Sequence, residues 1–513
     1  MESHCFNFWE EKKEGFDRRF LLGLFLFAFL IRLPFLLYPE VIHNDGAEYV
    51  RQAKLILSGD WTGGKAPPLY PSLIAFARVI LPDAEMAGIL ISVIFGALLI
   101  LPIYYLGKEI FGKRVGILSS LIAAVHPFLT SSSGSVLTES TYYFLVAATV
   151  LLGWYAFQRG RIYEIVLFSL LCSLAYLTRP EGIGFLIVFS LWAMIVNPSD
   201  EIRVWTKRAG VVFLSILCFF LFSSPYIIQI QKETGRWGIT KKFKILVASP
   251  SSENGTQSIE DFTKKKEVHL LSFVKDPLTV MKKIVVGFFQ SLYKFQQGYH
   301  PLLFLFALLG LFFHREGSFS MKGNLYLFSY VVFFLGFILP FFWVTRRYTS
   351  QMIPIAIPWA AFGFLNITIW ISRRLKEGIF QKKFQTLLLV ILLLGLFIQG
   401  SVIHGRDFRL IQKEVGLWMR DHLPKGQKMM SKMGQESFYA EQAWVKMPEK
   451  SYEEILKEAR TKGVRYLVID ENIEKDSPGF LEQSKNAELK SLFELRRKNR
   501  YMIVFEIVDP KGK

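Results

Sequence analysis

The 513-residue sequence contains only three cysteines, Cys5, Cys172 and Cys218. The first lies in the amino-terminal tail and the others in apolar stretches, so their spacing indicates neither a disulfide framework nor a CxxC metal site. The sequence also lacks a Gly-rich phosphate loop and a Walker lysine, which argues against a soluble nucleotide as substrate.

Acidic residues are also scarce, because 43 Asp and Glu stand against 61 Lys and Arg and leave a net charge of +18. Hydrophobic residues make up 51% of the chain, with 48 Phe, so the composition excludes a disordered protein. In a membrane protein such a basic excess reflects cytoplasmic loops and anionic lipid, and we therefore expect no nucleic-acid partner.

The apolar residues fall in long stretches that are nearly free of charge, which is typical of membrane-spanning helices and not of an ordinary soluble enzyme. The stretches are 20–38, 87–106, 115–130, 141–157, 163–178, 183–196, 210–231, 301–313, 325–344, 352–371 and 386–403. They predict a polytopic α-helical membrane protein with about eleven transmembrane helices. No small-residue cleavage site follows the first stretch, so we expect a retained anchor.

Lys and Arg in the short loops predict the orientation, because cytoplasmic loops are enriched in them. With a cytoplasmic amino terminus, the short external loops hold only Arg179, Arg346 and Arg347. The sequence thus predicts a multi-pass protein of the plasma (inner) membrane with an external carboxyl terminus.

Three segments follow from this topology. They are a cytoplasmic tail at 1–19, a transmembrane domain at 20–403 with external loops at about 39–86 and 232–300, and an extracytoplasmic domain at 404–513.

The last segment mixes 22 basic with 18 acidic residues, and we expect a small accessory α/β domain. Residues 453–463 and 488–499 are predicted as helices, and 464–470 and 501–508 as buried strands.

The first external loop carries the most informative polar residues. An amphipathic helix is expected over 46–57, directly after Asp45. Asp45 is then either an N-cap, with Glu48 as its capping partner, or a carboxylate available for proton transfer. Lys65 precedes a rigid Pro-Pro turn, where its ammonium either snorkels to the surface or holds a lipid phosphate.

Further ionisable residues adjoin apolar stretches on the same predicted side: Glu139, Arg179, Glu181, Arg346, Arg347 and Tyr348. Each alone has a local structural explanation as a helix-terminal acid, an ion pair or an interfacial anchor. Together with Asp45 and Lys65 they predict one shared site, since charges at membrane depth usually face a bundle interior or a water-filled cavity. Cations and a base in one place suit a lipid-linked phosphate ester, and the carboxylates leave Mg²⁺ or Mn²⁺ open as a cofactor.

These residues make the sequence similar to the GT-C glycosyltransferases, in the branch of the protein O-mannosyltransferases and the lipid A aminoarabinose transferases. Asp45 with Tyr49, the Gly59-Asp60 step and the turn at 67–70 match the family's first external loop. Gly46 departs from it, because the family often has Glu there. The resemblance continues through the Glu139 segment, 179–182 and 346–358, and covers roughly 20–400.

The resemblance implies a GT-C fold and an inverting transfer of a sugar from a polyprenyl-phosphate donor to a glycan, lipid or protein acceptor on the external face. It implies Asp45 as the general base, with Glu48 and Glu139 as the other candidates. The remaining implied residues are Lys65, Arg179, Arg346, Arg347 and Tyr348 for the donor phosphate, and Tyr49, Tyr70 and Glu181 for the acceptor or donor pocket. A transporter or flippase for a lipid-linked glycan, or a non-catalytic subunit of a glycan assembly complex, is the alternative function.

The predicted orientation can be tested with topology reporters. A reporter fused after Lys513 is expected to behave as external, and one inserted at 373–383 as cytoplasmic. Both reporters on one side would show that the number of spans between them is wrong by an odd number.

Overall fold

The computed structural model describes residues 14–37, 41–61, 64, 66–196, 205–241, 277–312, 320–341, 344–372, 379–402, 410–485, 488–497 and 500–508. The chain forms two compact units. Unit 1 comprises 1–37, 52–134 and 138–402, and unit 2 comprises 38–51, 135–137 and 403–513. The carboxyl-terminal domain therefore forms one unit with two short segments from the amino-terminal third of the chain.

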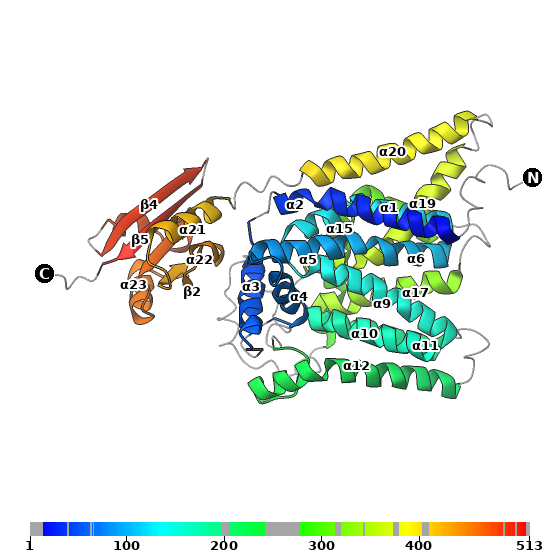
Figure 1. Cartoon of the computed structure of the whole chain (residues 1–513), viewed down its shortest axis with the longest axis horizontal. Helices are drawn as coiled ribbons and strands as arrows, with labels where there is room; N and C mark the ends of the chain where they lie inside the picture. The colour runs from blue at the N-terminus through cyan, green and yellow to red at the C-terminus, as the bar shows by residue number, and fades with distance from the viewer. Residues whose placement is uncertain are drawn as a thin grey trace, which may run out of the picture. The chain divides into compact units, whose positions relative to one another are not determined.

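Unit 1 is helical (Figure 1). Its α-helices are α1 (Glu14–Arg32), α2 (Pro34–Leu37), α4 (Leu69–Arg78), α5 (Ala84–Leu98), α6 (Ile100–Phe111), α7 (Lys113–Val125), α8 (Pro127–Ser131), α9 (Glu139–Arg159), α10 (Ile162–Thr178), α11 (Ile183–Ile195), α12 (Trp205–Thr234), α15 (Pro277–Tyr299), α16 (Pro301–Phe312), α17 (Met321–Val332), α18 (Arg346–Thr349), α19 (Ile353–Ser372) and α20 (Ile379–Val402). Short 3-10 or π turns are η1 (Ser132–Gly134), η2 (Pro180–Gly182), η5 (Phe333–Ile338), η6 (Leu339–Phe341) and η7 (Ser350–Met352). The helix α3 (Asn44–Leu57) crosses from unit 2 into unit 1.

Many of these helices are suited to a membrane. Among the described residues, seven are long and apolar enough to cross one, or nine if each of two bent helix pairs is a single span. Two further apolar helical segments, Ile162–Thr178 and Pro180–Ile195, are shorter. The polytopic helical membrane fold is thus confirmed, whereas the number of eleven spans stays a prediction.

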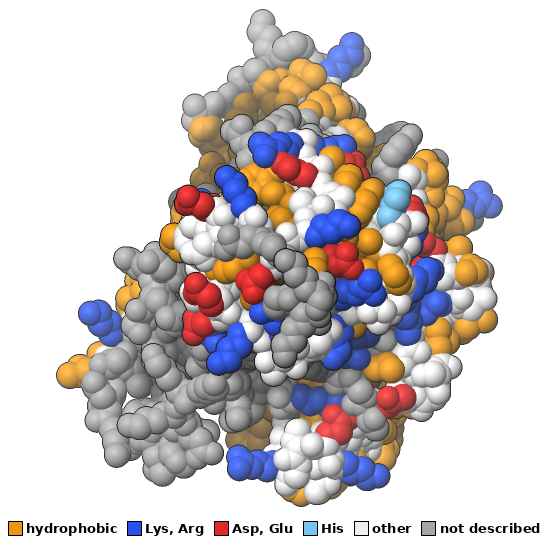
Figure 2. All heavy atoms as spheres, turned by 90° about the vertical axis from the view of Figure 1, so that its left-hand side faces the viewer, with side chains coloured by type: hydrophobic (Ala, Val, Ile, Leu, Met, Phe, Trp, Pro, Cys, Tyr) orange, Lys and Arg blue, Asp and Glu red, His pale blue; other side chains and the backbone are white. Residues whose placement is uncertain are grey.

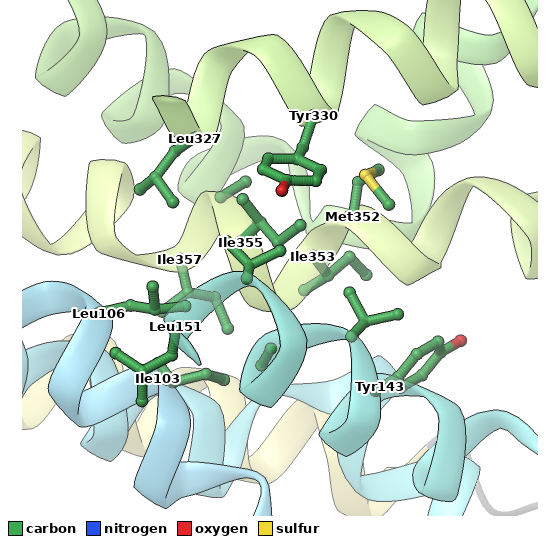
Figure 3. Packing of buried hydrophobic residues seen from close by; sticks show 14 of the residues in the cluster. Ile103, Leu106, Tyr143, Leu151, Leu327, Tyr330, Met352, Ile353, Ile355 and Ile357 are labelled. Atoms are coloured by element: carbon green, nitrogen blue, oxygen red, sulfur yellow. The ribbon is translucent and has the colours of Figure 1, made fainter. Parts of the chain in front are cut away.

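Burial separates central helices from peripheral ones. The apolar window in α9 is 83% buried and that in Arg346–Ser372 is 78% buried, whereas the window in α20 is only 17% buried. The central contacts join α6, α9, α17 and α19, whose Ile103, Leu151, Leu327 and Ile355 belong to one apolar cluster (Figure 3). We infer that α20 faces lipid, since apolar side chains exposed on a spanning helix are solvated by acyl chains.

Two glycines allow a close contact between α16 and α19. A Cβ atom at Gly363 in α19 would overlap the carbonyl oxygen of Phe306 in α16, and one at Gly310 would overlap that of Trp359. Small residues at such crossings let the two backbones touch, which is a common source of helix association in lipid.

Unit 2 contains α21 (Leu410–His422), β1 (Lys428–Ser431), α22 (Gln435–Ala440), β2 (Ala443–Lys446), α23 (Tyr452–Thr461), β3 (Tyr466–Asp470), α24 (Ile473–Asp476), α25 (Phe480–Gln483), β4 (Leu489–Arg497) and β5 (Arg500–Ile507). Its five-stranded sheet has the order β2-β1-β3-β5-β4. Strand β1 pairs in parallel with β2 and β3, with Met430 opposite Leu467, and β5 runs antiparallel to β3 and β4.

Both faces of the sheet are covered at the central strand β3, whose alternate residues point to opposite sides. Leu467 and Ile469 pack with Ile455 of α23, whereas Tyr466 and Val468 pack with Val415 of α21. The predicted small α/β domain is thereby confirmed. The face of the molecule in Figure 2 carries side chains of both charge signs interspersed with apolar ones.

The prediction of a helix over 488–499 is wrong, because residues 489–497 form β4. Leu489, Leu492 and Phe493 have helical spacing, but Phe493 pairs with Val504 after an irregularity that follows Ser491. The extra residue disrupts strict alternation along β4, so an edge strand resembles an amphipathic helix in sequence.

Burial and, to a smaller extent, the nearby Asp470 raise the pKa of Glu436 in α22 to about 8, although Ser431 donates a 3.5 Å hydrogen bond to its carboxylate. Between its ordinary value near 4.5 and about 8, the unfolded chain ionises while the folded domain keeps its proton. The contribution of Glu436 to stability is therefore present at acidic pH and lost as the pH rises.

We expect Glu436→Gln to raise the unfolding temperature of this domain at about pH 9, where the buried carboxylate costs on the order of a few kcal/mol. The gain should shrink towards about pH 5, where wild-type Glu436 is already protonated. Thermal unfolding of the full chain at both pH values measures it, and a gain that is equal at both would contradict the assignment.

Candidate functional site

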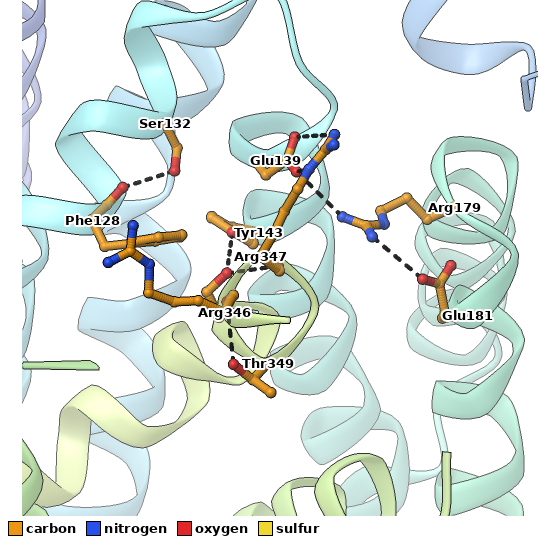
Figure 4. A network of polar contacts seen from close by, with 10 residues as sticks. Phe128, Ser132, Glu139, Tyr143, Arg179, Glu181, Arg346, Arg347 and Thr349 are labelled. Atoms are coloured by element: carbon orange, nitrogen blue, oxygen red, sulfur yellow. Dashed lines mark hydrogen bonds and ion pairs between the residues drawn. The ribbon is translucent and has the colours of Figure 1, made fainter. Parts of the chain in front are cut away.

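The carboxylate of Glu139 joins three separate segments of unit 1 (Figure 4). Glu139 begins α9, and its side chain is only 3% exposed. Arg347 of α18 donates from Nε to Oε1 of Glu139, and Arg179 at the end of α10 places Nη1 at 3.6 Å from the same oxygen. The pairs lie at one end of the bundle, because α9 begins where α10 ends.

Arg179 is enclosed by groups that suit its charge. Its Nη2 lies 3.4 Å from Oε1 of Glu181 in η2. The guanidinium carbon lies 4.8 Å from the ring centre of Tyr348 and 5.4 Å from that of Tyr142, which are cation–π distances. Four described groups, the carboxylates of Glu139 and Glu181 and the two tyrosine rings, thus lie around a cation that would otherwise be expensive to bury.

Arg346 has a different environment from its neighbour. Its guanidinium carbon lies 5.5 Å from the ring centre of Phe128, and Figure 4 shows it on the Phe128 side while Arg347 points to Glu139. Arg346 is exposed, and within the described part of the chain no acidic side chain forms a salt bridge with it. Its guanidinium is therefore more accessible than those of Arg179 and Arg347.

Sequence reasoning missed several polar contacts around the cluster. Tyr143 Oη lies 2.6 Å from Oγ of Ser350, and both residues are fully buried. Tyr142 and Tyr143 follow Glu139 by three and four residues, so helical spacing could have placed them on its face. Arg32 in α1 is also fully buried and donates to the carbonyls of Ala28 and Ala124 and to Ser133.

The next two predicted site residues are Tyr70 and Lys65 of the first external loop. Tyr70 is fully buried, and its hydroxyl lies 3.1 Å from the carbonyl oxygen of Gly88 and 2.9 Å from Oγ of Ser92. These contacts give Tyr70 a packing role between α4 and α5. Lys65 lies outside the described residues, although the adjacent Gly64 accepts a 2.8 Å hydrogen bond from Lys241.

Asp45, Glu48 and Tyr49 lie in unit 2, on the first turns of α3. The first helical bond runs from Ala47 N–H to the carbonyl of His43, so His43 occupies the N-cap position. The prediction that Asp45 immediately precedes the helix is therefore wrong. As a first-turn acid Asp45 interacts favourably with the helix dipole and is half-buried.

Glu48 is not a capping partner either. Its two carboxylate oxygens accept hydrogen bonds of 2.8 and 2.6 Å from Nε and Nη2 of Arg51. This bidentate pair engages both oxygens of the Glu48 carboxylate.

The packing of Gly46 explains why this chain lacks the second acid of the motif. A Cβ atom there would lie 2.6 Å from the carbonyl oxygen of Val136 and 2.9 Å from Cγ1 of Ile42. All three residues belong to unit 2. A glutamate at position 46 would require the 135–137 segment to move.

The sequence analysis left Mg²⁺ or Mn²⁺ open as a cofactor held by carboxylates. Within the described ranges, no group of three or more His, Cys, Asp or Glu side chains is arranged to hold a metal ion. The polar cluster around Glu139 in unit 1 consists of carboxylates and arginines flanked by tyrosines.

Sequence comparison matches part of the chain to a family of glycosyltransferases. Residues 65–228 match the family described as dolichyl-phosphate-mannose-protein mannosyltransferase. No curated protein sequence is similar enough to count as a match.

Solved structures resemble the chain over nearly its whole length. ArnT from Cupriavidus metallidurans, bound to undecaprenyl phosphate, has a TM-score of 0.60 at 12% identity, over 97% of this chain and 99% of that one. The oligosaccharyltransferase AglB from Archaeoglobus fulgidus, solved with an inhibitory peptide and dolichol-phosphate, has a TM-score of 0.59 at 13% identity, over 95% of this chain and 74% of that one.

A third similar structure is the mycobacterial arabinofuranosyltransferase AftD, with a TM-score of 0.53 at 12% identity, over 96% of this chain and 42% of that one. All three neighbours belong to the same superfamily as the matching sequence family. The chain therefore has the fold of the GT-C superfamily of membrane glycosyltransferases.

Proposed function

We propose that this protein is an inverting glycosyltransferase that moves a sugar from a polyprenyl-phosphate carrier to an acceptor on the external membrane face. The observation that carries the proposal is the cluster of Glu139, Arg179, Arg347 and Arg346 at one end of a GT-C helix bundle. Neighbouring structures that hold dolichol-phosphate and undecaprenyl phosphate support a lipid-linked donor.

The reaction is a single displacement at the anomeric carbon. An acceptor oxygen forms a bond to that carbon while the bond from carbon to the phosphate oxygen breaks, which inverts the configuration. The acceptor proton passes to a general base, and the lipid phosphate leaves with the electron pair. Such a step requires one base and at least one cation aimed at the phosphate, where negative charge develops.

Arg346 is the proposed phosphate ligand. Arg179 and Arg347 are already paired with Glu139, and Arg179 also with Glu181, so two carboxylates compensate their two charges in the resting protein. Arg346 is exposed and packs against Phe128, which leaves its donor groups directed to solvent or to a ligand. Lys65, for which only the sequence argues, is a second proposed phosphate contact.

Asp45 is the proposed base. Of the other two candidates, Glu48 is held by Arg51, and Glu139 is held by Arg179 and Arg347. A carboxylate whose oxygens are occupied by guanidinium groups accepts a proton less readily. Tyr49 and Glu181 are proposed to line the donor or acceptor pocket.

Turnover by the purified protein tests the proposal as a whole. With a polyprenyl-phosphate sugar as donor, polyprenyl phosphate should be released in step with glycosylation of the acceptor. Movement of the intact donor across a vesicle membrane without release would instead show a transporter, and absence of both activities would favour a non-catalytic subunit.

Asp45→Asn tests the base. Asparagine is nearly isosteric but cannot take a proton, and loss of general-base assistance typically costs about 10² to 10⁴ in rate. We expect kcat to fall at least about 100-fold while donor binding and thermal stability stay near wild type. Near-normal turnover would return Asp45 to a structural role.

Arg346→Ala tests the phosphate ligand. A hydrogen bond to a charged group contributes about 1.5 to 3 kcal/mol, so we expect the donor KM to rise about tenfold or more. Arg346→Lys keeps the charge but loses the planar fork and should be intermediate.

Arg161→Ala is the matched control, because Arg161 is an exposed arginine at the opposite end of α10. It should behave as wild type. An equal rise of the donor KM in Arg161→Ala and Arg346→Ala would assign the effect to general surface charge.

A further inference from the structure

The segment that carries Asp45 is bonded to the carboxyl-terminal domain within unit 2. The backbone N–H of Ile42 donates a 2.8 Å hydrogen bond to the hydroxyl oxygen of Tyr439. The side chain of Asn44 accepts a 3.0 Å bond from Gly434 N–H and donates a 3.3 Å bond to Met433 Sδ. These three contacts join residues about 390 positions apart in the sequence.

The contacts on the domain side come from a well-anchored element. Tyr439 lies in α22 and is 6% exposed. Gly416 of α21 packs so closely on α22 that a Cβ atom would lie 2.7 Å from the carbonyl oxygen of Glu436. Ser437 Oγ also donates a 2.8 Å hydrogen bond to Gly434 O, which fixes the start of the helix.

Asp45 is thus flanked on both sides by residues that have fixed positions. Asn44 is bonded to 433–434, and Gly46 packs on the carbonyl of Val136. Ile42 is only 1% exposed, so the hydrogen bond that it makes to Tyr439 is shielded from water. With both neighbours held, the backbone at Asp45 has little freedom to shift.

We propose that the carboxyl-terminal domain positions the base of the transfer reaction, with Tyr439 and Asn44 as positioning residues. The inference rests on the proposed role of Asp45. Positioning matters because a base must lie within hydrogen-bond distance of the acceptor hydroxyl, and a displacement of about 1 Å can lower the rate about 100-fold. The domain then acts on the chemical step through the backbone of α3.

Tyr439→Phe tests the inference, because it removes the hydroxyl that accepts the Ile42 bond and keeps the ring. We expect kcat to fall about tenfold, with the donor KM changed less than about twofold. Amide hydrogen exchange over 41–50 should become faster, while exchange over β1 and β3 stays unchanged.

Tyr452→Phe is the matched control. Tyr452 is a buried tyrosine of the same domain, and its hydroxyl has no hydrogen-bond partner among the residues that the structure describes. This variant should keep wild-type kinetics and exchange. A loss of kcat as large as that of Tyr439→Phe would show a general effect of domain stability and would overturn the inference.

The double variant Asp45→Asn, Tyr439→Phe separates the inference from the proposed function. If Tyr439 acts through Asp45, the double variant should be no slower than Asp45→Asn alone. Additive losses, or unchanged kcat in Tyr439→Phe, would overturn the positioning role. Normal turnover in Asp45→Asn alone would instead overturn the base assignment, and the exchange experiment would still report on the contact itself.

Discussion

The buried negative charge of Glu139 must be compensated by nearby cations. This requirement determines how the helix ends around Glu139 are arranged in unit 1. A lone charge in a low-dielectric interior is very costly, and removal of one partner from a buried pair leaves the other uncompensated. Arg179 and Arg347 reach Glu139 from segments that lie about 40 and about 208 residues away along the chain. The end of α10 and the start of the α18–α19 segment are therefore tied to the start of α9.

The membrane part was largely predictable from the sequence, because few structures can span a lipid bilayer and spanning helices require long apolar stretches. The sequence also assigned Glu139, Arg179, Arg346 and Arg347 to one side, and the structure brings them together. It did not reveal which of these arginines would form no salt bridge with an acidic side chain of the described residues. That distinction depends on rotamers, since Arg346 and Arg347 are adjacent in sequence and point to different neighbours.

Unit 2 shows where sequence patterns stop being informative. Strands β3 and β5 and helix α23 were predicted, because their apolar residues are either continuous or strictly periodic. Strand β4 was missed, since its irregular pairing after Ser491 imitates helical spacing. The contact of Asn44 with Gly434 could not be predicted at all, because its partners are about 390 residues apart and each is chemically ordinary.

The contact between Gly310 and Gly363 links helix packing to the chemistry of the cluster. Backbone atoms touch at this crossing, so α19 cannot slide along α16 without a steric clash. Residues 346–352 lead directly into α19, and its axial position therefore determines how far Arg346 and Arg347 extend beyond the bundle. Gly310 and Gly363 thus fix the axial position of the segment that carries the two arginines. A methyl group added to either glycine would shift α19 and change how far the arginine side chains extend from the bundle.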